Sequence, residues 1–257
     1  MAARYTEGMK RGFFLPWLPA TLFRRRALTA YPKTSISLEE LGTQDRPYRP
    51  TFAFPGAYIN AHHRMFSECK TDGVCVDIGI PGWLSPEDAL KLYELAYFAG
   101  GDILELGCYH GLSTSVIASA IRDGGDKKRL TSVDLHSQLI AAARETLASR
   151  GLLSTTDFRI GDGAELCRQF KTQGKHFVFV FIDHAHTYQA VYDVCTILKD
   201  IVNPGGLCLF HDYNNPRNAD PENLDYGVWQ AVEDGLPRDA FQFYGVFGCT
   251  GLFRRLP

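Results

Sequence analysis

From residue 100 onward, short apolar runs alternate with amphipathic stretches of helical length, and this alternation limits the fold more than any other feature of the chain. The apolar runs predict strands at about 102–107, 130–135, 156–161, 177–183 and 206–212. The predicted helices begin near Ser113 and Ser137 and cover about 163–172 and 187–201. Such alternation is typical of a parallel sheet with helices on both faces.

Both ends of this region add further elements. Ser85 followed by Pro86 and two acidic residues predicts a helix from 85 to about 99. A polar loop, 214–225, precedes a short helix around 226–236, and two apolar runs joined by a Gly-flanked turn predict a closing antiparallel hairpin. We therefore expect an α/β fold with a doubly wound, mostly parallel seven-stranded sheet. We expect residues 85–257 to form its domain and residues 1–84 to be a partly irregular N-terminal extension, with a lid or a dimer arm as its expected role.

Composition and charge narrow the function. With 257 residues and 45% hydrophobic content, the chain can bury one large core. Residues 1–33 contain seven basic residues and one acidic residue, so this segment carries +6 and the remainder −8, against a net charge of −2. An acidic body argues against a broad nucleic-acid surface, so no nucleic-acid partner is expected.

Cysteine usage and hydropathy suggest where the protein resides. The seven cysteines are scattered and form no CxxC pair, which argues against zinc and thioredoxin-like sites and favours a reducing, cytoplasmic setting. The apolar stretch 13–23 contains two prolines and is too short to span a bilayer, so no membrane span is expected. The basic N-terminus leaves three interpretations open: a solvated tail, an arm that docks on a second copy of the chain, or an anchor at a membrane surface.

The first strand ends in ELGCYHG, residues 105–111, and a helix follows. The first amide groups of such a helix lack partners and point toward whatever lies above the sheet edge. A dinucleotide site would need glycines at the positions of Tyr109 and Leu112. This mismatch opposes a nucleotide-dependent oxidoreductase.

The remaining pattern places an acid, Glu105, two residues before Gly107 and six before Gly111. A carboxylate repels phosphate, so the turn suits a cationic ligand without phosphates, and S-adenosylmethionine carries both an ammonium and a sulfonium charge. We expect Glu105 to meet the ammonium. The amides and hydroxyls of Ser113 and Thr114 are then placed to take the carboxylate.

Two more acids end neighbouring strands. Asp134 ends the second strand, where its carboxylate can accept hydrogen bonds from both ribose hydroxyls. Asp162 lies in GDG after the third strand, placed to bond an adenine amine, with Gly163 leaving room for the ring. Three acids at one sheet edge favour a ligand site over a simple tight connection.

On these residues, 100–255 resembles the class I S-adenosylmethionine-dependent methyltransferases, with ELGCYHG as the cofactor loop. Within that group, FIDHAHTYQAVYDV and NPGGLCLFHDY are similar to macrocin-type sugar O-methyltransferases and related small-molecule enzymes. The resemblance implies a Rossmann-like methyltransferase fold and metal-binding acids at Asp183 and Asp212, with Asp183 also close to the cofactor. Tyr213 departs from the pattern, because metal-dependent relatives usually have Asp or Asn there.

The residues that follow the fourth and fifth strands form a second constellation, in which Asp183, His186 and His211 are the catalytic candidates. Methyl transfer requires that the acceptor oxygen be aligned and lose its proton. Either Asp183 and Asp212 bind Mg²⁺, which lowers the pKa of the acceptor hydroxyl, or a histidine removes the proton without a metal. Spacing alone does not rank His186 against His211.

The acceptor is expected to be a hydroxyl of a small molecule, such as a sugar or a natural product. Enzymes that methylate amino groups of nucleic-acid bases typically carry a [DN]PP[YF] pattern after strand four. This chain has IDHAHTY there, which argues against a base nitrogen as the acceptor. The loop 214–225 and the region 45–84, with Tyr48, Phe52, Phe54, Tyr58 and Phe66, are either acceptor walls or ordinary packing. The remaining alternative is a scaffold that binds cofactor without turnover.

Overall fold

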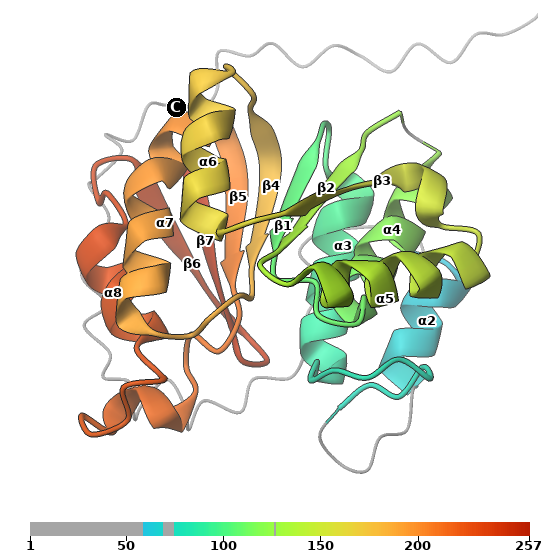
Figure 1. Ribbon diagram of the computed structural model, residues 1–257, viewed down its shortest axis with the longest axis horizontal. Helices are drawn as coiled ribbons and strands as arrows, with labels where there is room; N and C mark the ends of the chain where they lie inside the picture. The colour runs from blue at the N-terminus through green and yellow to red at the C-terminus, as the bar shows by residue number, and fades with distance from the viewer. Residues whose placement is uncertain (1–58, 69–74, 126) are drawn as a thin grey trace, which may run out of the picture.

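The computed structural model describes residues 59–68, 75–125 and 127–257. Seven strands form one sheet in the order β3-β2-β1-β4-β5-β7-β6 (Figure 1). The strands are β1 (Ile103–Leu106), β2 (Leu130–Asp134), β3 (Thr156–Ile160), β4 (Phe177–Ile182), β5 (Val202–Phe210), β6 (Phe241–Phe247) and β7 (Thr250–Arg255). The pairs among β1 to β5 are parallel, whereas β7 is antiparallel to both β5 and β6. The predicted fold class and the closing hairpin are confirmed.

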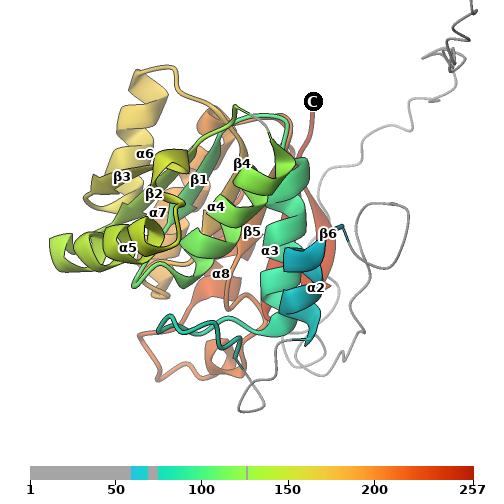
Figure 2. The same ribbon diagram turned by 90° about the vertical axis from the view of Figure 1, so that its right-hand side faces the viewer.

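Helices cover both faces of this sheet, as the alternating pattern predicted. They are α2 (Ala61–Glu68), α3 (Pro86–Phe98), α4 (Leu112–Gly124), α5 (Ser137–Ser149), α6 (Gly163–Thr172), α7 (Tyr188–Ile201) and α8 (Val228–Gly235), with short 3₁₀ turns η1 (Leu153–Thr155) and η2 (Pro216–Ala219). Helices α6, α7 and α8 lie on one side of the sheet, and α3, α4 and α5 lie on the other (Figure 1). Helix α2 lies alongside α3 (Figure 2).

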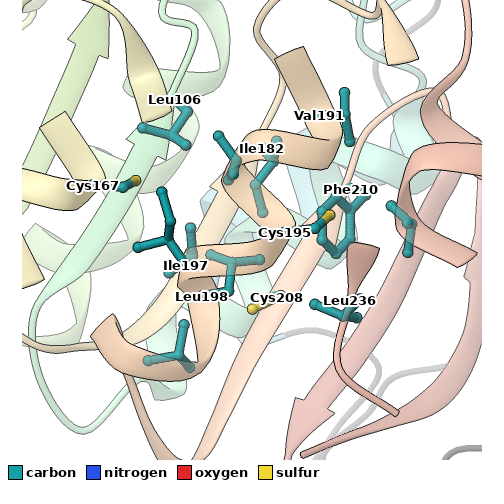
Figure 3. Close-up of a cluster of buried hydrophobic side chains, with 14 of the residues drawn as sticks. Leu106, Cys167, Ile182, Val191, Cys195, Ile197, Leu198, Cys208, Phe210 and Leu236 are labelled. Carbon is teal, nitrogen blue, oxygen red and sulfur yellow. The ribbon is translucent and has the colours of Figure 1, made fainter. Parts of the chain in front are cut away.

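Each face of the sheet has its own apolar core. On the α6–α8 side, Cys167, Cys195, Leu198 and Phe210 are fully buried together, as Figure 3 shows for this cluster. On the other side, residues from α3 and α4 pack against Phe179 and Phe181 of β4. Cysteines buried in this way act as small hydrophobic residues. The alternation of side chains along β4 therefore feeds both cores from one strand.

The start of β5 differs from the prediction. The strand was expected at 206–212, but it begins at Val202, directly after α7. Val202 pairs with Phe177, and the register resumes only at Leu207 opposite Phe179, so the intervening residues form an irregularity in the ladder. Gly205 has a φ of 82°, which permits this detour. The strand ends at Phe210, and His211 and Asp212 therefore lie in the turn that follows.

Local sequence explains the helix starts around the site. Ser85 and Asp88 form a capping box at the start of α3, with Pro86 at the first helical position. Asp162 caps α6 and Thr187 caps α7, each by accepting a hydrogen bond from the backbone amide three residues further along the chain. These caps fix the chain direction where it leaves the sheet edge.

Several predicted features fall outside the described residues: the basic arm, the apolar stretch 13–23, Tyr48, Phe52, Phe54 and Tyr58. Within the described part of the N-terminal region, Phe66, Val76 and Leu84 are buried in the core beneath α3. Among the helices that the structure describes, none combines the length and apolar character needed to cross a membrane.

Candidate active site

A cavity of about 1050 Å³ opens at the carboxyl ends of β1, β4 and β5. Its walls come from the turn after β1, the segment that leads into α3, the loop between β5 and α8, and the β6–β7 turn. Figure 1 shows the segment before α3 and the loop before α8 at the same end of the sheet. Loops at this end of a parallel sheet are the usual location of ligand sites.

The glycines of the turn after β1 are required by packing. Gly107 has a φ of 94°, and a Cβ there would overlap the carbonyl oxygen of Asp183 at the end of β4. Gly111, with a φ of 89°, begins α4 and lies against Ala143 of α5. The turn therefore fits tightly between β4 and α5, and Gly107 itself lines the cavity.

Glu105 lies beneath the turn and is fully buried. Its carboxylate accepts hydrogen bonds from the hydroxyls of Ser113 (2.6 Å), Thr114 (2.7 Å) and Ser132 (2.6 Å). Burial raises the pKa of Glu105 to about 7, although the three hydroxyl hydrogen bonds oppose that shift. The hydroxyls of Ser113 and Thr114 are already bound to Glu105. These hydrogen bonds, with that from Ser132, connect β1 to β2 and α4. The expected contact with an ammonium stays a prediction.

Asp134 ties the end of β2 to the glycine turn. One oxygen of its carboxylate accepts the backbone amides of Cys108 (3.3 Å) and Tyr109 (3.1 Å), and the other accepts the amide of His136 (3.0 Å). The side chain is half-buried, so it keeps an accessible edge. The ribose contact predicted for Asp134 is compatible with this position and stays a prediction.

At the end of β3, Asp162 is exposed and accepts the amide of Glu165 at 2.9 Å. Only one of its two oxygens is used in this cap. Gly163 lies beside His184, since a Cβ there would be 3.5 Å from the imidazole carbon. The predicted adenine contacts of Asp162 and Gly163 are not tested by this geometry.

The residues after β4 and β5 meet in one compact cluster. His186 Nε2 lies 3.4 Å from Asp183 Oδ1 and 3.2 Å from Asp212 Oδ2. His211 Nδ1 lies 3.1 Å from Asp183 Oδ1 and 3.7 Å from Asp212 Oδ2. All four side chains line the cavity. The structure thus brings together the two groups that the sequence placed on neighbouring strands.

Burial and charge compete in this cluster. Burial disfavours the charged form of Asp183, but the facing His211 and His186 outweigh it and hold the pKa of this carboxyl below its usual value. The pKa of Asp212 is lowered in the same way, against burial, by a hydrogen bond and charge from His211. Burial lowers the pKa of His211, but the charge of Asp183 raises it well above the usual value. Both acids are therefore ionised at neutral pH.

The far side of the His211 ring faces a second group of polar atoms. His211 Nε2 lies 3.3 Å from Cys249 Sγ in the β6–β7 turn and 3.9 Å from Asp88 Oδ2 at the start of α3. Asp88 is fully buried and accepts hydrogen bonds from the hydroxyl of Ser85 and the backbone amide of Cys249. We call Ser85, Asp88 and Cys249 the outer trio.

With this geometry in place, the comparisons with known proteins become informative. A family model described as a methyltransferase domain matches residues 104–213, which run from β1 to the turn after β5. That range contains the glycine turn and the whole of the cluster formed by Asp183, His186, His211 and Asp212. Residues 104–213 are thus similar to the methyltransferase-domain family. The resemblance to class I methyltransferases is confirmed by this match.

Solved structures share the fold of the methyltransferase domain. The O-methyltransferase TomG from Streptomyces achromogenes, involved in tomaymycin synthesis and solved in complex with SAM, aligns with a TM-score of 0.55 and 20% identity, covering 68% of this chain and 82% of that one. An O-methyltransferase from Bacillus cereus in complex with SAH aligns with a TM-score of 0.57 and 18% identity, covering 69% and 84%.

A third structure, described as a putative O-methyltransferase from Klebsiella pneumoniae, aligns with a TM-score of 0.58 and 18% identity, covering 70% of this chain and 84% of that one. At these identities the alignments establish the fold of the methyltransferase domain. No curated protein sequence matches the chain.

The cavity of the methyltransferase domain also contains residues that sequence reasoning gave no role. Among them, Asp88 was recognised only as a helix-capping acid and Cys249 only as part of a hairpin turn. Tyr226 stacks face to face on His186, with ring centroids 5.1 Å apart and an interplanar angle of 7°. Trp83, 73% exposed, lies 5.9 Å from the ring of Tyr109. These residues come from segments outside the βα pattern, where no local signal marks them.

Proposed function

We propose that this protein transfers a methyl group from S-adenosylmethionine to a hydroxyl of a small molecule. The observation that carries the proposal is the single cavity in which the glycine turn and the acid–histidine cluster after β4 and β5 meet. The fold neighbours TomG and the Bacillus cereus enzyme, with SAM and SAH in their structures, support the choice of cofactor.

The cofactor side of the cavity is the turn after β1. S-adenosylmethionine would supply an electrophilic methyl group there. Asp134 and Asp162 would hold its ribose and adenine from the ends of β2 and β3, and Gly163 keeps space beside the ring. Gly107 lets the backbone approach without a side chain. Glu105 is buried beneath the turn with its pKa raised to about 7, and a cationic ligand above it would favour its ionised form.

The acceptor side is lined by aromatic and cationic groups. Tyr226 stacks on His186, and Arg217 donates a hydrogen bond to the Tyr226 hydroxyl at 2.8 Å with its guanidinium over the ring. Trp83 and Tyr109 stand at the other edge. Flat aromatic faces stack on sugar or phenolic rings, and they leave a hydroxyl free to enter the cluster.

His186 is the better candidate for the general base. Its side chain is 29% exposed, against 7% for His211, and it lines the cavity. Its Nε2 lacks a hydrogen-bond partner among the described residues. This nitrogen is enclosed between Asp183 and Asp212, so the ring must turn its Nε2 toward the acceptor hydroxyl before it can remove the proton.

The same cluster fits a divalent cation. Asp183 and Asp212 are ionised and face the same two imidazole nitrogens at 3.1–3.7 Å. A hard cation such as Mg²⁺ at these carboxylates would fix the acceptor oxygen and lower its pKa. Asp183 and Asp212 are thus the proposed metal ligands.

Calorimetry with S-adenosylhomocysteine tests the cofactor site. The wild-type protein should bind it with a micromolar-range Kd, and Asp134→Ala should weaken binding at least about ten-fold because both the ribose contact and the anchor of the glycine turn are lost. The exposed Asp239→Ala serves as the matched control and should bind normally. Absence of binding heat from the wild-type protein would end the proposal.

Turnover tests the acceptor side. On a panel of phenols, catechols and sugars, His186→Ala should lower kcat about 100-fold or more, with unchanged affinity for S-adenosylhomocysteine. Asp212→Asn should act similarly. Cofactor binding without methyl transfer to any acceptor would instead indicate a non-catalytic scaffold, and normal turnover by both variants would remove the cluster from the mechanism.

A further inference from the structure

His211 occupies an unusual position between two acidic groups. We propose that His211 is a metal ligand through Nδ1, together with Asp183 and Asp212, and that this nitrogen makes the site selective for a transition-metal dication such as Mn²⁺, Fe²⁺ or Zn²⁺ over Mg²⁺. The inference rests on the cavity of the proposed function but concerns only this chain's own ligands. It assigns the two histidines different tasks.

The first argument is the state of Nδ1. The side chain of His211 is only 7% exposed, and among the described residues Nδ1 has ion-pair contacts with the two acids but no hydrogen bond that meets the geometric criterion. It nevertheless lies 3.1 Å from Asp183 Oδ1 and 3.7 Å from Asp212 Oδ2. Buried polar atoms without a partner are rare, because each costs about 1–3 kcal/mol. A cation bound at Nδ1 would satisfy this nitrogen and neutralise the carboxylates that face it.

The second argument is the outer trio, which determines which ring nitrogen is free. Nε2 faces Cys249 Sγ at 3.3 Å and the buried carboxylate of Asp88 at 3.9 Å. When a metal ion displaces the Nδ1 proton of the ring, the remaining proton stays on Nε2, where acceptors face it, and the Nδ1 lone pair then points toward Asp183 and Asp212. Ligating histidines commonly donate their second N–H to a carboxylate or another acceptor in this way.

The trio is itself rigid. Asp88 is held at the start of α3 by Ser85, and the β6–β7 turn lies so close that a Cβ at Gly248 would overlap the Asp88 carboxylate. The orientation of the His211 ring is therefore imposed by two elements that do not belong to the sheet edge of the acids. Preorganisation of this kind is what a metal site needs.

His186 lacks these supports. Its ring is more exposed and is stacked on Tyr226. Its Nε2 also lies within 4.8 Å of the ligand atoms of Asp183 and His211, but its ring is held by stacking rather than by the outer trio, so we assign the base to His186 and the ligand to His211. The choice of metal follows from the donors: two carboxylates alone suit Mg²⁺, whereas an imidazole nitrogen favours first-row transition metals, and Mg²⁺ binds almost exclusively to oxygen.

The decisive experiment is electron spin-echo spectroscopy of the full-length protein loaded with Mn²⁺. The wild type should show modulation from a coordinated ¹⁴N, His211→Ala should lose it, and the matched control His186→Ala should keep it. Modulation that survives in His211→Ala, or a wild-type protein without any ¹⁴N coupling, would overturn the inference.

Metal titrations give an independent readout. Mn²⁺ should compete effectively against a large excess of Mg²⁺ in the wild type, and His211→Asp, which makes the site all-oxygen, should reduce that preference at least about ten-fold. Asp88→Asn keeps a helix-capping side chain but weakens the outer trio, and should lower Mn²⁺ affinity about ten-fold. Equal preference in the wild type and His211→Asp would count against nitrogen ligation.

Failure of this inference is separable from failure of the proposed function. A protein that binds S-adenosylhomocysteine and transfers methyl groups without ¹⁴N coupling to Mn²⁺ keeps the function and loses the ligand assignment. A protein with the coupling but no affinity for S-adenosylhomocysteine does the reverse. Circular dichroism of each variant establishes that it is folded before either result is interpreted.

Discussion

At the scale of single residues, Glu105 shows how one side chain can serve structure and ligand at once. The sequence placed an acid at the end of β1, and that acid suggested a cationic ligand. The structure adds that the carboxylate is buried beneath three hydroxyls from α4 and β2. Burial disfavours the ionised form of this side chain and raises its pKa to about 7.

This pKa predicts a pH-dependent stability. In the unfolded chain Glu105 ionises near the ordinary glutamate pKa of 4.5, whereas the folded protein holds the proton until about pH 7. The folded state therefore binds more protons in this window, and the free energy of unfolding should fall by about 3 kcal/mol as pH rises from about 4.5 to 7. Glu105→Gln cannot ionise and should lack this loss.

The measurement is urea unfolding at pH 5 and pH 8 for the wild type and Glu105→Gln. Relative to the variant, the wild type should lose stability at pH 8. Glu145→Gln, at an exposed acid on α5, controls for the loss of one charge. Equal changes with pH in the wild type and Glu105→Gln would show that the buried carboxyl ionises normally.

At the scale of elements, the turn after β1 is the joint between β1, β4 and α5. Gly107 combines a positive φ with a position where any side chain would overlap the backbone of Asp183. Sequence reasoning assigned this glycine to the cofactor. The packing shows that the residue is needed even without ligand, because the turn must pass directly over the end of β4.

Alanine substitutions can separate the strain of a positive φ from the overlap with the backbone of β4. Gly107→Ala should destabilise the protein by about 3 kcal/mol or more, since strain and overlap act together. Gly125→Ala, where φ is 67° but nothing lies within 4 Å, should cost only about 1 kcal/mol of strain. Thermal and urea unfolding of both variants test this, and equal destabilisation would show that the β4 contact yields easily.

The predicted start of β5, at residue 206, was wrong because pairing between strands was not visible in the sequence. Asn203, Pro204 and Gly205 were correctly taken as the end of α7, but strand pairing began at once at Val202. Hydrogen bonding to β4 on both sides of the irregular segment holds it in the sheet. A local pattern of helix breakers cannot reveal such pairing, because the partner strand lies far away in the sequence.

At the scale of the whole molecule, the cavity is assembled from segments more than 150 residues apart. Asp88 at the start of α3 accepts the amide of Cys249 in the last hairpin, and both face His211 after β5. The strand order places β5 beside β7, which brings that hairpin turn next to the acid–histidine cluster. The acid–histidine cluster is therefore bounded on one side by the ends of β4 and β5 and on the other by the start of α3 and the β6–β7 turn.

The sequence by itself determined the α/β fold, the seven strands, the glycine turn and the acids and histidines after β4 and β5. These features are local: hydrophobic period, helix caps and strand ends are written in consecutive residues. Only the tertiary structure decided that Glu105 is buried under hydroxyls, that His186 is exposed while His211 is enclosed, and that Asp88 and Cys249 stand behind His211. Those facts depend on which distant surfaces pack together, and burial and ring orientation follow from that packing alone.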